Sequence, residues 1–71
     1  MKLTVKDKVK IVMDRQNMTM TSLAAATGQT RQNLGNKMTR GNFSEADILK
    51  IAEALGCQVD IVFTLPNGEQ I

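Results

Sequence analysis

The chain has no histidine, tryptophan or tyrosine, and only one cysteine and one proline among its 71 residues. A single cysteine cannot form an internal disulfide bond. Without histidine or paired carboxylates at helical spacing, the chain has no obvious general base, nucleophile pair or metal-ligand cluster. These absences argue against an enzyme, and we expect no cofactor. Cys57 is more typical of a small buried residue than of a redox sensor.

Long apolar runs are also missing. No stretch approaches the roughly 20 apolar residues of a membrane-spanning helix, and the N-terminus MKLTVKDK has no signal-peptide core. We therefore expect a cytoplasmic protein with no membrane partner, and no small-molecule ligand is evident. A single domain of this size buries only about 60% of its unfolded surface, so oligomerisation is one way to add to its marginal stability.

The residues that are present are organised around positions 19–38, TMTSLAAATGQTRQNLGNKM, a stretch typical of two short helices joined by a tight turn. Thr19 and Thr30 are good N-caps, because their side-chain oxygens accept hydrogen bonds from the free amides of a first turn. Gly28 tolerates the left-handed conformation that commonly closes a helix. Leu34 and Met38 are four residues apart and give the second helix an apolar side.

The other side of this second helix, Thr30 to Met38, is polar and carries no carboxylate. Arginine, glutamine and asparagine present planar hydrogen-bonding groups that match the major-groove edges of guanine or adenine. A carboxylate at the same place would repel phosphate. This side therefore suits a polyanion, and its members are Arg31, Gln32, Asn33, Gly35, Asn36 and Lys37.

Two further helices are predicted, one on each side of this stretch. Thr4 followed by Asp7 marks the start of a helix that ends near Asn17, since a cap and an acid in the first turn both satisfy free amides. Ser44 followed by Asp47 marks the start of another, which Gly56 ends. The apolar stripe of this last helix should pack beneath the two central helices, and it consists of Ile48, Leu49, Ile51, Ala52 and Leu55.

The sequence resembles the phage repressor and Cro type of helix-turn-helix regulators, also called the XRE type. The resemblance runs from about Val5 to Gly56 and depends on the spacing of Leu23-Ala24, Gly28, Thr30 and Leu34, followed by Phe43-Ser44 and the run IAEALG. It implies a mainly α, compact four-helix lambda-repressor-like DNA-binding domain over residues 1–56, with the Thr30 to Met38 helix in the major groove. The implied function is sequence-specific binding of double-stranded DNA by a repressor-like transcriptional regulator.

The resemblance also implies roles for individual residues. Those expected to read bases are Arg31, Gln32, Asn33 and Asn36, and those expected to contact the DNA backbone are Thr19, Thr30, Lys37, Arg40 and Asn42. An ordinary solvated turn is an equally good interpretation of the loop around Arg40 and Asn42. For the whole chain, the alternative is a protein-interaction or antitoxin-like module that keeps the helix-turn-helix scaffold without reading DNA sequence.

Three methionines depart from the family pattern. Met20 stands where members often have a glutamine that contacts the DNA backbone. Met13 and Met38 stand where many members pair an arginine of the first helix with a glutamate at the end of the third. Since apolar side chains can replace such an ion pair without loss of stability, we expect Met13 and Met38 to touch.

The formal net charge of +2 is unevenly distributed. Residues 1–42 have a net charge of +6, and residues 43–71 have a net charge of −4. The basic half contains the expected DNA-binding helix, and such polarity would orient the protein on a polyanion and weaken its binding as salt rises. Uneven charge on an ordinary solvated surface is the alternative interpretation.

After Gly56 the helical period gives way to an alternating one, which predicts one half-buried C-terminal β-strand from Gln58 to Leu65. A lone strand leaves its amides unpaired, and too few residues follow the turn at positions 66–68 for a return strand. We therefore expect this segment to be a dimerisation element that pairs antiparallel with a second copy, placing the two recognition helices about 34 Å apart. A short hairpin within a monomer is the alternative. The residues expected in the dimer interface are Val59, Ile61, Phe63 and Leu65.

Overall fold

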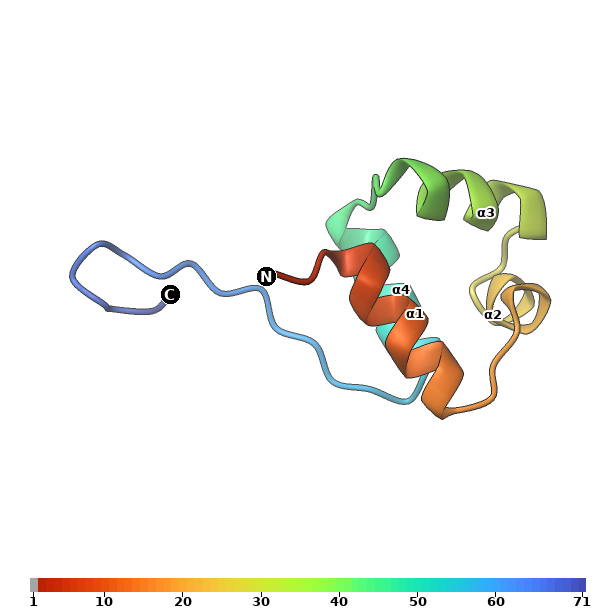
Figure 1. The fold of residues 1–71 in the computed structure, drawn as a ribbon, viewed down its shortest axis with the longest axis horizontal. Helices are drawn as coiled ribbons and strands as arrows, with labels where there is room; N and C mark the ends of the chain where they lie inside the picture. Colours follow the sequence, from red (N-terminus) through yellow and green to blue (C-terminus); the bar gives the residue numbers. More distant parts are fainter. Residues whose placement is uncertain (1) are drawn as a thin grey trace.

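The computed structural model describes residues 2–71, which form four helices and a C-terminal tail (Figure 1). The helices are α1 (Val5–Arg15), α2 (Met20–Ala26), α3 (Arg31–Arg40) and α4 (Glu45–Ala54). The mainly α, four-helix fold predicted from the sequence is therefore confirmed. None of these four helices has the length or the apolar character that a bilayer crossing requires.

Each helix begins at a side chain that caps its first turn. The capping hydroxyl accepts a hydrogen bond from the backbone N–H three residues later in every case, at Thr4, Thr19, Thr30 and Ser44. In α1 and α4 an aspartate at that third position accepts the N–H of the capping residue in return, which completes a capping box. Because such a cap is worth about 1 kcal/mol, the start of each helix is determined locally.

Helix α3 is longer than the sequence predicted. It continues two residues past the expected end at Met38, and its last residue is Arg40. Gly41 then adopts a left-handed conformation with φ of 64°, and the N–H of Asn42 donates to the carbonyl of Lys37. The helix therefore ends where a glycine first allows the backbone to reverse, rather than where the apolar pattern ends.

The buried core lies where the four helices meet. Leu23 of α2 and Leu34 of α3 are both fully buried, and α2 packs against α3 and α4. The core therefore holds the two helices of the motif as one unit, and its members are Val9, Met13, Leu23, Ala24, Leu34, Met38, Ile51 and Leu55. Leu49, which we expected in the apolar stripe of α4, is 50% exposed because it lies on the outer side of that helix.

The C-terminal strand that the alternation predicted is not present. Residues 57–71 leave the helical body and end in a loop that lies apart from it (Figure 1, blue). Within the part of the chain that the structure describes, the only β-type pairing is an isolated antiparallel bridge between Thr64 and Gln70. The alternation describes which residues could share a face, but a strand also needs a neighbouring strand to pair with.

The tail nevertheless turns back on itself, contrary to the expectation that too few residues remain. Phe63 and Ile71 exchange two backbone hydrogen bonds of 2.8 and 2.9 Å, and the N–H of Leu65 donates to the carbonyl of Glu69. The turn is closed by a hydrogen bond from Gly68 to Leu65, and Gly68 has φ of 92°. A three-residue loop with a left-handed glycine at its end is one of the common hairpin connections, so a very short return segment suffices.

Candidate nucleic-acid interface

The turn between α2 and α3 is held by a chain of side-chain hydrogen bonds. The hydroxyl of Thr27 donates to the carbonyl of Leu23 at 2.9 Å. The amide of Gln29 donates to the Thr27 oxygen at 2.9 Å, and the amide nitrogen of Asn33 donates to Oε1 of Gln29 at 3.2 Å. This chain connects the end of α2 to the first turn of α3 and fixes the orientation of the Asn33 side chain. The sequence analysis did not find it, because no motif marks these three residues.

The outward side of α3 is polar along its whole length. Gln32, Asn36 and Arg40 are four residues apart, so they lie in one row along the helix, and all three are exposed. This row is on the side away from Leu34 and Met38, which are buried. No acidic residue occurs in α3. The helix therefore presents amide and guanidinium groups to solvent without a competing negative charge.

The other residues predicted to read bases lie on either side of this row. Arg31 is exposed at the first position of α3, and Asn33 is exposed beside Gln32. The structure therefore leaves all four predicted base-reading side chains accessible on one helix.

The residues predicted to contact the DNA backbone fall into two groups. Thr19 and Thr30 are exposed and cap α2 and α3, so their hydroxyls lie at two helix N-termini. On the flank of α3 that faces α4, a hollow of about 370 Å3 brings predicted base-reading and backbone residues together, and its lining includes Asn33, Asn36, Lys37, Arg40 and Asn42. This flank therefore joins the end of α3 to the loop that follows it.

A family model described as Cro/C1-type HTH DNA-binding domain matches residues 8–65 of the chain. The chain belongs to this family. The match confirms the resemblance seen in the sequence and extends it beyond Gly56 into the tail. No significant match was found among curated proteins or among solved structures. Membership of this family supports DNA binding by the domain.

In this Cro/C1-type domain, the Lys37 side chain is committed to a contact within the protein. Its ammonium lies 2.7 Å from a carboxylate oxygen of Asp47, and both side chains are partly buried. The other oxygen of Asp47 accepts the backbone N–H of Ser44 at 3.0 Å. The hydrogen bond from Lys37, followed by that from Ser44, lowers the pKa of Asp47 from its usual 3.8 to about 2. This ion pair connects the last turn of α3 to the first turn of α4. It was not predicted from the sequence, because its partners belong to different helices.

We expect Asp47→Asn to lower the free energy of unfolding by about 1 kcal/mol near pH 7, because it weakens both the ion pair and the capping box. The folded-state pKa of Asp47 is depressed, so its stabilising contribution is present above about pH 4 and is lost as pH falls through about 2. The stability difference between the wild type and the variant should shrink over that range. Urea denaturation followed by circular dichroism at several pH values measures it.

Glu45→Gln is the matched control for this prediction. Glu45 is an exposed acid in the same first turn of α4, so its replacement removes the same charge without removing the contact with Lys37. Equal losses of stability in the two variants would show that the effect belongs to the charge of the helix N-terminus and not to the Lys37–Asp47 pair.

Proposed function

We propose that this domain binds double-stranded DNA sequence-specifically, with α3 in the major groove, and acts as a repressor-like transcriptional regulator. The observation that carries the proposal is the exposed polar side of α3. This side has no acidic residue, and the opposite side of the helix is apolar and buried. Asparagine and glutamine amides match the edge of adenine, and arginine matches guanine. The proposed base-reading residues are Arg31, Gln32, Asn33 and Asn36.

Contacts to the sugar-phosphate backbone would position the helix. Thr19 and Thr30 stand at helix N-termini, where free amides attract phosphate. Arg40 and Asn42 flank the end of α3 and are exposed. Lys37 adds positive charge nearby, but its ion pair with Asp47 reduces its attraction for a DNA phosphate. The backbone contacts would give register and affinity, and the base-reading residues would give specificity.

Selection from a random pool of duplex DNA, followed by a salt titration, tests this proposal. We expect one enriched motif, with affinity for it at least about 1,000-fold above that for unrelated duplex at physiological salt. Both affinities should fall as salt rises, because phosphate contacts release counterions. Binding that depends on salt but enriches no motif would instead favour a module that keeps the scaffold without reading sequence.

We infer also that the tail pairs two copies of the domain. Its apolar side chains are largely open to solvent, and Ile61, Phe63 and Ile71 are 50%, 71% and 73% exposed. In extended backbone, successive residues direct their N–H and C=O groups to opposite edges. Phe63 and Leu65 use one edge for the hairpin, so Val62 and Thr64 face the other edge, which is open to a second strand.

A two-fold axis restricts how residues 58–65 of two copies can pair. Directly opposed residues in an antiparallel pair have their side chains on the same face of the sheet. Pairing Ile61 with its own symmetry mate places Val59 opposite Phe63 and keeps the apolar face continuous across both copies. The proposed interface therefore comprises Val59, Ile61, Phe63 and Leu65, and it would place the two α3 helices about one DNA turn apart, near 34 Å.

We expect the wild-type protein to have twice its chain mass of 7.8 kDa at micromolar concentration, and Ile61→Lys to have the single-chain mass. Lysine at the centre of the pairing would place two like charges opposite one another, which is unfavourable. Size-exclusion chromatography with light scattering measures both masses. Ile11→Lys is the control, because Ile11 is also a partly exposed apolar residue but lies on α1. A wild-type mass near 7.8 kDa would contradict the inference.

A further inference from the structure

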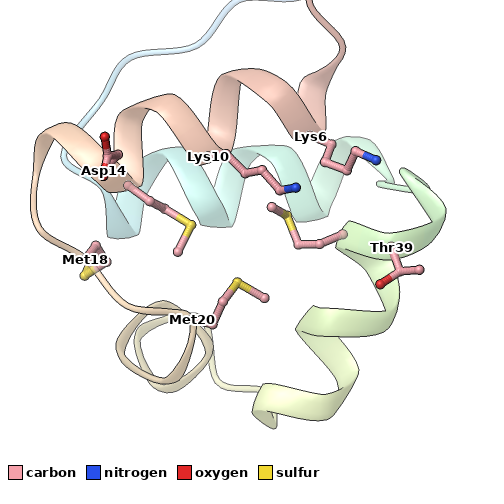
Figure 2. Close-up of a pocket in the computed structure, with 8 residues that line it drawn as sticks. Lys6, Lys10, Asp14, Met18, Met20 and Thr39 are labelled. Carbon is pink, nitrogen blue, oxygen red and sulfur yellow. The ribbon is translucent and has the colours of Figure 1, made fainter.

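A cavity of about 650 Å3 lies between α1, the start of α2 and the end of α3 (Figure 2). Four of the chain's five methionines line it, and the fifth, Met1, lies outside the described residues. This volume falls within the usual range for small-molecule sites, which is about 300 to 1,000 Å3. The complete lining consists of Lys6, Lys10, Met13, Asp14, Met18, Met20, Met38 and Thr39.

The walls of this cavity are apolar and adaptable. Met13 and Met38 are buried members of the core, whereas Met18 and Met20 are half-buried and lie nearer to solvent. Methionine is unbranched and polarisable, so it fits apolar groups of different shapes and is common at adaptable binding surfaces. Met13, Met20 and Met38 come from three different helices and line this one cavity.

The charge around the opening is not symmetric. Lys6 and Lys10 are one turn apart on α1, and Figure 2 shows both at the opening, with Thr39 near one end and Asp14 toward the other. Among residues 2–71 the structure shows one salt bridge, between Lys37 and Asp47, so neither of these lysines is paired in one. The lining thus offers two ammonium groups beside an apolar wall, with one acid, Asp14, at the far end. Asp7 is outside the lining but interacts electrostatically with both lysines.

We propose that the cavity binds a small single-chain amphiphile with one anionic end, of the medium-chain carboxylate type. The hydrocarbon chain lies against the methionines, and the carboxylate lies between Lys6 and Lys10, near the Thr39 hydroxyl. Asp14 disfavours a second anionic group at the other end of the chain. A sugar-phosphate backbone would complement the lysines but would gain nothing from four thioether side chains, so the lining favours an amphiphile over a nucleic acid.

This site goes beyond DNA binding but is physically connected to the surface proposed for it. Met38 and Thr39 belong to the last turns of α3, and Met20 is the first residue of α2. Two of the methionines that a bound chain would contact, Met13 and Met38, are also members of the buried core. A ligand bound in the cavity would therefore be expected to affect the position of α3.

Titration of protein carrying carbon-13 methionine methyl groups with decanoate, below the concentration at which decanoate aggregates, tests the proposal. We expect saturable chemical-shift changes at the methyls of Met13, Met18, Met20 and Met38. Decanol lacks the charge and butyrate lacks the chain, so both should bind at least about tenfold more weakly. The combined variant Lys6→Gln, Lys10→Gln should weaken decanoate binding by a similar factor.

The matched control is the combined variant Lys8→Gln, Lys50→Gln. It removes the same charge from α1 and α4 at exposed positions that do not line this cavity, and decanoate affinity should not change. Circular dichroism shows whether each variant is folded. Because the titration contains no DNA, its result does not depend on whether the domain reads DNA sequence.

Five results would overturn the proposal. Decanoate that shifts the methionine methyls without saturation would show that there is no site. Equal weakening in both lysine variants would show a general charge effect, and equal binding of decanol would show that the lysines hold no anion. Loss of DNA affinity in the Lys6→Gln, Lys10→Gln variant without any decanoate site would assign these lysines to phosphate. Association with anionic vesicles in place of decanoate would assign the surface to a membrane.

Discussion

Replacement of Leu34 by alanine is expected to lower the free energy of unfolding by about 3 kcal/mol, within the usual range of about 2 to 5 for such a change. Leu34 is fully buried, so the variant loses the transfer free energy of the deleted atoms and retains part of the cavity that they leave. A domain of 71 residues has a total stability of only about 4 to 10 kcal/mol. The expected loss is therefore a large fraction of the total stability. Urea denaturation at 25 °C measures the difference.

The position of Leu34 adds a functional consequence to this loss. It is on the buried side of α3, so the cavity left by alanine lies directly under the polar row that we propose to read DNA. Leu49→Ala is the control, because Leu49 is half exposed on α4 and its truncation should cost less than about 1 kcal/mol. A loss below about 1 kcal/mol for Leu34→Ala would mean that the core does not depend on this contact.

The combined variant Arg31→Ala, Gln32→Ala is expected to abolish sequence preference while leaving non-specific DNA binding largely intact. Each well-formed bidentate contact to a base contributes about 1 to 3 kcal/mol of discrimination, so removal of two should reduce the specificity ratio by about 30-fold or more. Both side chains are exposed, so the fold should not change. Fluorescence anisotropy with the selected duplex and with a scrambled duplex measures this ratio at a fixed salt concentration.

A closely matched control is available within the same chain. Arg15 and Gln16 form the same dipeptide at the end of α1, and both are exposed. The combined variant Arg15→Ala, Gln16→Ala removes the same groups and the same charge at a distance from α3. If it reduced the specificity ratio as much as the α3 variant does, the assignment of α3 as the recognition helix would be wrong.

Much of the fold could be predicted because its signals are local. Four N-caps and the glycines after α2, α3 and α4 mark helix boundaries within a few residues of sequence, and the hydrogen bonds of those caps are present. The end of α3 was misplaced because the apolar period stops at Met38, whereas the helix continues until Gly41 can reverse the backbone. The end of a helix, which depends on backbone conformation, need not coincide with the end of its buried apolar pattern.

The features that were missed depend on residues brought together by folding. The Lys37–Asp47 ion pair joins two helices, and the Gln29–Asn33 hydrogen bond depends on the geometry of the turn between α2 and α3. The alternation after Gly56 suggested a strand. Within residues 2–71, however, the segment forms only one isolated β-bridge, between Thr64 and Gln70. The methionine departures were visible one by one, yet only the structure shows that Met13, Met20 and Met38 line the same cavity.

The separation of the tail from the core has a kinetic consequence. The buried cluster contains no residue after Cys57, although Val59 and Ile61 line a hollow together with α1 and α4. The four helices can therefore reach their core packing without the tail. Helical domains whose contacts are mostly between sequence neighbours fold in microseconds to milliseconds. The pairing that we propose for the tail would, in contrast, be a bimolecular encounter whose rate rises with the square of the protein concentration. Such a regulator would fold at any protein concentration. It would present two DNA-binding helices together only at concentrations high enough for two tails to pair.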